Sequence, residues 1–166
     1  MRRPLRAASI LALVTGASAL TGCTGPQPAD IPDPATYEAQ LLEQINALRL
    51  PNGRDRLAAN DCLTAHARER AQQLPGAQSA PEQDLPHDCG GDYLGENISR
   101  SDLLPADVTD AWASDDLQRP NLLDPLFTTV GVGCVGVALE DTSRVALDGE
   151  DLASMACSVI FQGDQE

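Results

Sequence analysis

The stretch VGVGCVGVAL, residues 130–139, decides the fold of this chain together with ASMACSVIF, residues 153–161. Both are rich in valine and other small apolar residues, so we predict that both are strands. The acidic segment between them, EDTSRVALDGEDL, is expected to be the loop of a hairpin. The rest of the fold is therefore expected to assemble around these two strands.

Three helices are predicted ahead of the strands, over residues 36–49, over residues 61–74 and from Pro105 onward. In the first, apolar residues recur at helical spacing after Asp33-Pro34, a suitable N-cap and first position. In the third, Val108, Ala111 and Trp112 are expected to face inward. The segments 76–94 and 118–130 are expected to be a polar loop and an irregular connection. Helices first and strands last, in a mixed order, predict the α+β class.

The N-terminus, MRRPLRAASILALVTGASALTGC, is typical of an export signal. Three arginines precede an apolar run over residues 7–19, which is shorter than the about 20 residues that a membrane-spanning helix needs. Leu20-Thr21-Gly22-Cys23 resembles the bacterial lipobox, in which the cysteine is lipidated; an ordinary signal peptide with a chance cysteine is the alternative. We therefore expect a lipoprotein signal peptide over residues 1–22, a lipidated Cys23 with a proline-rich tether over residues 23–35, and a folded domain over residues 36–163. The expected location is extracytoplasmic, with a lipid anchor in the cell membrane.

The charge of the chain is strongly acidic, with 25 acidic residues, 11 arginines and no lysine, for a net charge of −14. Such a surface repels the phosphate backbone, so we expect no nucleic-acid partner. Solubility or salt tolerance outside the cell is the simplest interpretation of the charge. No nucleophile elbow, phosphate loop or nucleotide fingerprint occurs in the sequence.

Four cysteines remain after Cys23, namely Cys62, Cys89, Cys134 and Cys157. An even number in an exported domain predicts two disulfides, with three possible pairings. If the two strands form a hairpin, Cys134 and Cys157 fall near opposite positions, which leaves Cys62 to reach Cys89. None of the four has the C-x-x-C spacing of a zinc site, so we interpret them as disulfide cysteines.

The stretch HDCGGDYLGENIS, residues 87–99, places His87 near Glu96 in a segment with three glycines. We interpret it mainly as a tightly turned loop, in which glycine permits positive φ and Glu96 and Asn97 satisfy unpaired backbone amides. The other histidine, His66, lies on the second predicted helix and is interpreted as a half-exposed structural residue.

Four segments in order resemble the CAP superfamily, which includes cysteine-rich secretory proteins, insect venom allergens and plant pathogenesis-related proteins. They are INALR (45–49), PHDCGGDYLGENIS (86–99), DAWASDD (110–116) and QRPNLLDPLFTTVGVGC (118–134). In the second segment, Gly95-Glu96-Asn97-Ile98 matches the GEN[IL] signature of that family. The resemblance covers residues 36–162 and implies a three-layer α-β-α sandwich. It also implies a cleft lined by two histidines and two acids, which some members of the family use to bind a divalent metal.

Carried over residue by residue, the resemblance places His87, Glu96 and Asp115 in that cleft, and Gln118 where the family has its second histidine. A neutral amide is a poor replacement for imidazole as a zinc ligand, so we predict no metal site and at most weak binding of a harder divalent cation. The expected function is a non-enzymatic binding module whose ligand is a lipid, a cell-envelope component or a protein. One alternative is a hydrolase of peptide or envelope substrates that uses His87 as a base oriented by Glu96, with or without a metal. Another is a purely structural envelope protein with no small ligand.

Overall fold

The computed structural model describes residues 31–82 and 84–164. The expected signal peptide, Cys23 and most of the expected tether therefore lie outside the described residues. In chain order the elements are α1 (Pro34–Arg49), the 3-10 helix η1 (Leu50–Asn52), β1 (Ala58–Ala59), α2 (Asp61–Ala71), β2 (Tyr93–Ser101), α3 (Pro105–Ser114), α4 (Arg119–Leu123), β3 (Phe127–Ala138) and β4 (Leu152–Gly163).

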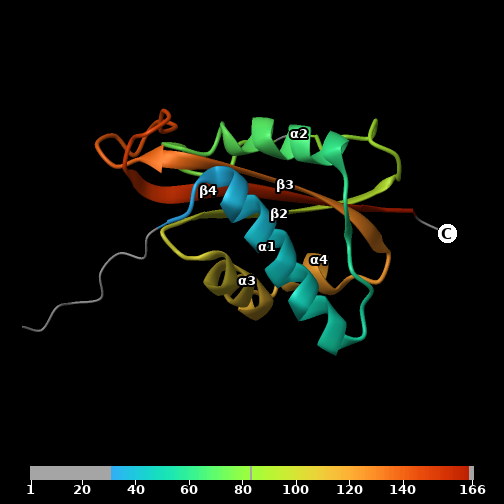
Figure 1. Ribbon diagram of the computed structural model, residues 1–166. Helices are drawn as coiled ribbons and strands as arrows, with labels where there is room; N and C mark the ends of the chain where they lie inside the picture. Colours follow the sequence, from blue (N-terminus) through green and yellow to red (C-terminus); the bar gives the residue numbers. More distant parts are fainter. Residues whose placement is uncertain (1–30, 83, 165–166) are drawn as a thin grey trace, which may run out of the picture.

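The sheet has the strand order β1-β3-β4-β2 and confirms the predicted hairpin. Strand β4 pairs antiparallel with β3 on one side and with β2 on the other, and the two-residue β1 runs parallel to β3. Helix α2 covers one face of this sheet, while α1, α3 and α4 cover the other (Figure 1). The molecule is therefore an α+β protein with the expected three-layer α-β-α sandwich.

Both disulfides join the predicted partners. Cys134 and Cys157 are directly opposite each other in the β3–β4 register, and Cys62 at the start of α2 is bonded to Cys89 in the loop before β2. The first bridge lies inside the sheet, whereas the second fastens a loop to a helix. The disulfide pairing predicted from the hairpin is therefore confirmed.

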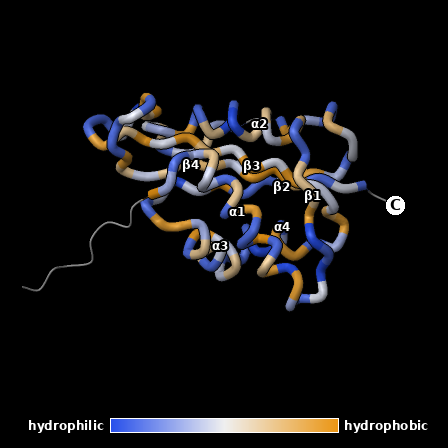
Figure 2. Tube along the Cα trace, viewed as in Figure 1, coloured by the Kyte–Doolittle hydropathy of each residue, from blue (hydrophilic) through white to orange (hydrophobic). Residues whose placement is uncertain are grey.

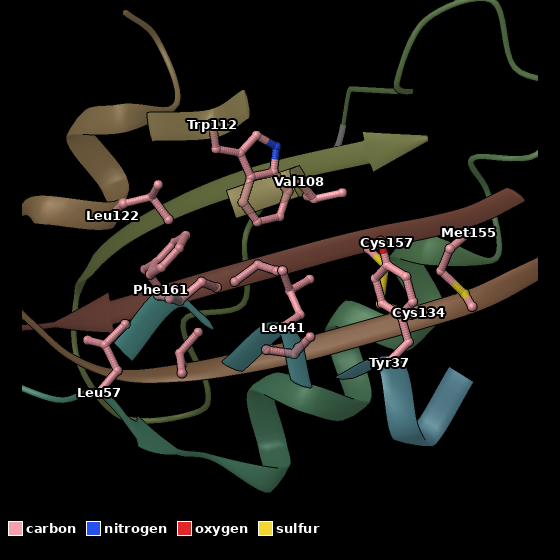
Figure 3. Close-up of a cluster of buried hydrophobic side chains, with 14 of the residues drawn as sticks. Tyr37, Leu41, Leu57, Val108, Trp112, Leu122, Cys134, Met155, Cys157 and Phe161 are labelled. Carbon is pink, nitrogen blue, oxygen red and sulfur yellow. A yellow bond between two sulfur atoms is a disulfide. The ribbon is translucent and has the colours of Figure 1, made fainter. Parts of the chain in front are cut away.

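The larger core cluster lies between the sheet and the layer of α1, α3 and α4 (Figure 3). Tyr37, Leu41, Trp112, Leu122 and Phe161 are among its buried members, each no more than 3% exposed. Figure 2 shows that the strands between the helical layers carry hydrophobic segments. Across the ranges that the structure describes, no helix combines the length and apolarity needed to span a bilayer.

The valines and glycines that alternate in β3 lie on its two opposite faces. Val130 and Val132 belong to the larger core cluster. Gly131 and Gly133 face α2, where a Cβ at Gly133 would collide with the backbone of Ala67 and Arg68. The glycines therefore let α2 pack directly on the strand, which is why a valine-glycine alternation occurs in a central strand.

Residues 87–99 are not the tightly turned loop predicted from their glycines. From Tyr93 onward they form β2, whose backbone pairs with β4, and Gly90 is the only glycine of the stretch with a positive φ, at 123°. Gly95 is needed for space, because a Cβ there would lie 2.8 Å from the side-chain oxygen of Asn121 and 2.9 Å from the Phe127 ring. The signature Gly95-Glu96-Asn97 is thus part of a strand.

Two further expectations are corrected by the structure. The connection over residues 118–130 is ordered as α4 followed by the start of β3 at Phe127. Ala111 is exposed on α3, whereas Val108 and Trp112 face inward as predicted.

Arg49 explains how the α4–β3 connection is held. This residue is 1% exposed at the C-terminal end of α1, and its guanidinium donates hydrogen bonds to backbone carbonyls. The acceptors are Asp55 O at 2.8 Å, Leu122 O at 2.7 Å, Asp124 O at 3.2 Å and Phe127 O at 3.2 Å. One buried cation therefore satisfies four carbonyls and fixes the entry of the chain into β3.

Candidate functional site

Strand β2 is the edge strand that carries the GEN signature, and its alternating side chains face the two helical layers. Glu96 points toward α2 and contacts Arg70 of that helix and Ser158 of β4. Asn97 points toward α3 and α4, where its amide donates to Gln118 O at 3.1 Å. Neighbouring residues of the signature thus serve opposite faces of the sheet.

Glu96 is held in a largely buried ion pair. Its Oε1 accepts a hydrogen bond from Arg70 Nε at 3.1 Å and one from Ser158 Oγ at 2.7 Å. The side chains of Arg70 and Glu96 are 6% and 15% exposed. The carboxylate is therefore committed to α2 and β4, and Arg70 Nη1 beside it is buried with no hydrogen-bond partner in the described part of the chain.

Asp115 and Gln118 lie together on the other face of the sheet, at the turn between α3 and α4. Asp115 Oδ1 accepts from the backbone N–H of Leu117 at 2.8 Å and of Gln118 at 3.0 Å. Gln118 Oε1 is buried and has no hydrogen-bond partner among the described residues. Asp115 thus stabilises the turn. The turn holds the side-chain oxygen of Gln118 in a buried position without giving it a hydrogen-bond donor.

Asn97 and Asn121 fasten this turn to β2. Asn121 Nδ2 donates to Glu96 O at 3.0 Å and to Asn97 Oδ1 at 2.9 Å. Together with the Asn97–Gln118 bond, these contacts bridge the edge strand and α4. Asn121 was not predicted as a site residue; its place three residues after Gln118 in the QRPN segment is the signal that could have identified it.

A groove of about 270 Å³ opens between β2 and α3, and we call it the β2–α3 groove. Its walls include Ser99, Ser101, Leu103, Ala111, Trp112, Asp115 and Gln118. Trp112 is 3% exposed, and its Nε1 donates to Ile98 O at 3.1 Å, which fixes the indole against the strand. The groove therefore combines an apolar wall from α3 with hydroxyl, amide and carboxylate groups at its rim.

His87 lies apart from this groove, in an exposed bend of the loop before β2. Within the described ranges the structure contains no hydrogen bond between His87 and Glu96. Of the four residues expected to line one cleft, Asp115 and Gln118 share the β2–α3 groove, Glu96 lies on the α2 face, and His87 lies in the loop.

The chain belongs to the cysteine-rich secretory protein family, CAP, whose model matches residues 42–141, more than half of the sequence. An uncharacterized protein of Bacillus subtilis, YkwD, is 32% identical over 111 residues, which are 61% of this chain and 43% of that protein. The chain thus spans less than half the length of this curated relative.

Solved structures share the fold at low sequence identity. An outer surface protein from Borrelia burgdorferi has a TM-score of 0.55 and 15% identity, with 77% of this chain and 93% of that chain covered. An extracellular SCP-domain protein from Bacillus anthracis has a TM-score of 0.53 and 17% identity, with 78% and 41% covered. These similarities establish the fold, whereas the function has to be inferred from the residues of the site.

Proposed function

We propose that this protein is a non-enzymatic binding domain, tethered outside the cytoplasm by a lipid at Cys23, that takes its ligand in the β2–α3 groove. The observation that carries the proposal is the position of Glu96, which is bonded to Arg70 and Ser158 on the opposite sheet face from Asp115 and Gln118. This arrangement offers a groove with a polar rim instead of an assembled set of catalytic or metal-binding groups.

The chemistry of the groove favours an apolar group attached to a larger ligand. At about 270 Å³ the groove is smaller than most sites that enclose a whole small molecule, which measure roughly 300–1,000 Å³. Val108, Ala111 and Trp112 supply an apolar wall, and Leu103 at its mouth is 40% exposed. An acyl chain of a lipid or of a cell-envelope component fits this combination, with its polar part near Ser99, Ser101 and Gln118.

The proposed location rests on the N-terminal sequence and on the relatives. The lipobox-like Leu20-Thr21-Gly22-Cys23 supports a lipid anchor. Proteins of the same fold include one described as extracellular and one described as an outer surface protein. Replacement of Cys23 by serine is expected to abolish the incorporation of labelled palmitate into the protein, and unchanged incorporation would contradict the anchor.

The single tryptophan of the chain makes ligand binding directly measurable. Because Trp112 lines the groove, titration with lauric acid as the probe is expected to give a saturable change in fluorescence. Ala111→Arg places a long charged side chain in the groove and is expected to weaken binding at least tenfold. Ala106→Arg, the same change at an exposed position of α3 outside the groove, is the matched control and is expected to bind as the wild type.

Two outcomes of these assays would contradict the proposal. A fluorescence change that is equal in Ala111→Arg and Ala106→Arg would show that the groove does not take the acyl chain. Hydrolysis of a fluorescent casein or of purified peptidoglycan by the wild type, abolished in folded His87→Ala, would show that the protein is an enzyme.

A further inference from the structure

A second cluster of chemically active side chains surrounds the Cys62–Cys89 disulfide, on α2 and the loop before β2. Cys62, His66, Asp88 and Cys89 each offer a ligand atom, and these atoms all lie within 4.8 Å of one another. His66 Nε2 is 3.3 Å from Asp88 Oδ1, and the same oxygen is 3.8 Å from Cys89 Sγ. The cluster contains none of the residues of the β2–α3 groove.

The two disulfides of the protein differ in their access to solvent. Cys134 and Cys157 are 3% and 0% exposed within the larger core cluster. Cys62 is exposed and Cys89 is half-buried. A small reductant can therefore reach Cys62–Cys89 in the folded protein, while Cys134–Cys157 is shielded.

We propose that the reduced form of this cluster is a zinc site, with Cys62, His66, Asp88 and Cys89 as the four ligands. Two thiolates, an imidazole and a carboxylate are donors that zinc accepts in tetrahedral array. A Zn–S distance of about 2.3 Å requires the two sulfur atoms to be about 3.8 Å apart, so the disulfide and the zinc form exclude each other. The oxidation state of this one bridge thus decides whether the site exists.

The change between the two forms is a thiol–disulfide exchange followed by metal binding. A dithiol reductant attacks the Cys62–Cys89 bond, forms its own disulfide, and leaves each cysteine sulfur with a proton. Zinc then displaces these two protons as it binds the two thiolates, with no further change in oxidation state. Reoxidation by a disulfide of the same class reverses the exchange and releases the metal.

The sequence and fold of α2 preorganise this ligand set. Cys62 and His66 are four residues apart on α2, so their side chains lie on one face of the helix. Cys62 is also in the first turn of α2, where the helix dipole stabilises a thiolate. Both features favour a deprotonated Cys62 sulfur beside an imidazole nitrogen of His66.

The loop that carries Asp88 and Cys89 has contacts that survive reduction. Asn60 Nδ2 donates to Cys89 O at 3.4 Å, and Gln162 Nε2 donates to Gly91 O at 2.9 Å. Leu85 of the same loop packs on the small apolar cluster of Leu63, Ala67 and Ile160. Cleavage of the disulfide therefore leaves the loop beside α2, where its ligands are within reach.

Cobalt(II) is the probe for this site, because it replaces zinc and reports thiolate ligation by its absorption. The full chain carrying Cys23→Ser is reduced with dithiothreitol without denaturant, desalted without oxygen, and checked for its fold by circular dichroism. Alkylation and mass spectrometry are expected to show free Cys62 and Cys89 and an intact Cys134–Cys157 bridge. Cobalt is then expected to give sulfur-to-metal charge transfer and the intense visible bands of a tetrahedral site, both removed by zinc.

The two histidines of the chain provide matched variants. His66→Ala is expected to weaken cobalt binding at least tenfold and to change the visible bands, whereas His87→Ala is expected to bind as the parent. The oxidised protein is expected to show neither absorption. Equal binding in His66→Ala and His87→Ala, charge transfer that is absent from the reduced protein, or loss of the fold on reduction would each overturn the proposal.

Discussion

Tyr37 is a single residue whose ionisation is tied to the stability of the fold. Its side chain is buried between α1 and the sheet, and its hydroxyl donates to Leu103 O at 2.8 Å. Burial, with a further contribution from the nearby Asp107 carboxylate, raises the pKa of Tyr37 to about 12. The neutral hydroxyl is therefore the form that the folded state prefers.

This pKa predicts how the protein responds to alkaline pH. Because the folded pKa lies above the ordinary value of 10.0, the contribution of Tyr37 to stability is complete below about pH 10 and is lost as the pH rises toward about 12. Thermal unfolding between pH 9 and 12 is expected to show a fall in Tm that is smaller in Tyr37→Phe. A parallel fall in both proteins would contradict the assignment.

Single residues also show where sequence reasoning reached its limit. The replacement of the family histidine by Gln118 is visible in the sequence, and so is the N-cap role of Asp33, whose side chain accepts from Thr36 N. The direction of the Glu96 side chain is not visible in the sequence, because the face that a strand residue occupies depends on the register with β4. Glu96 was predicted to lie in a turn, and a residue in a turn gives no indication that its carboxylate contacts Arg70.

At the level of elements, a carboxylate joins two helices to the edge of β3. Glu38 on α1 is 8% exposed, and its Oε1 accepts from Arg68 Nε on α2 at 3.0 Å and from the backbone N–H of Cys134 at 3.0 Å. Strand β1 pairs only with Thr129 and Val130, so this N–H lies beyond the reach of that strand. Glu38 thus replaces a strand as the partner of the β3 edge.

Removal of this carboxylate is expected to destabilise the fold more than removal of its cation. Glu38→Ala leaves the buried Cys134 N–H without a partner and is expected to lower the free energy of unfolding by about 1–3 kcal/mol. Arg68→Ala is expected to cost less than about 1 kcal/mol, because the Arg68 side chain is 54% exposed. Urea unfolding of both variants and of Glu38→Gln, which keeps an acceptor, measures the difference; a larger loss in Arg68→Ala would contradict the role of Glu38.

Elements with periodic or uniformly apolar sequences were predictable, and the others were not. Helix α1 ends at Arg49 as its leucine spacing indicates, and β3 and β4 include nearly all of the two predicted strands, residues 130–139 and 153–161. Strand β2 has glycine, asparagine and serine where a strand usually has branched residues, so its local sequence favours a turn. Pairing with β4 overrides that preference, and a single sequence does not contain this information.

For the whole molecule, one disulfide lies in the centre of the fold and the other attaches a loop to its outside. Cys134–Cys157 cross-links the two central strands inside the larger core cluster. Cys62–Cys89 attaches the loop before β2 to the outer helical layer. Their sequence separations, 23 and 27 residues, are similar, so loop-closure entropy predicts nearly equal contributions of about 3–4 kcal/mol each.

The surroundings of the two disulfides predict that their removal will nevertheless lower the stability of the protein by different amounts. Cys134→Ala with Cys157→Ala removes two buried sulfur atoms from a packed core, so about 1–3 kcal/mol for the resulting cavity is added to the entropic loss. Cys62→Ser with Cys89→Ser leaves hydroxyls at an exposed and a half-buried position, where no comparable cavity forms. Urea unfolding of both double variants in a Cys23→Ser background is expected to place the first below the second in stability. Equal midpoints would mean that loop closure alone sets the contribution of both bridges, and that the core adapts to the missing sulfur atoms.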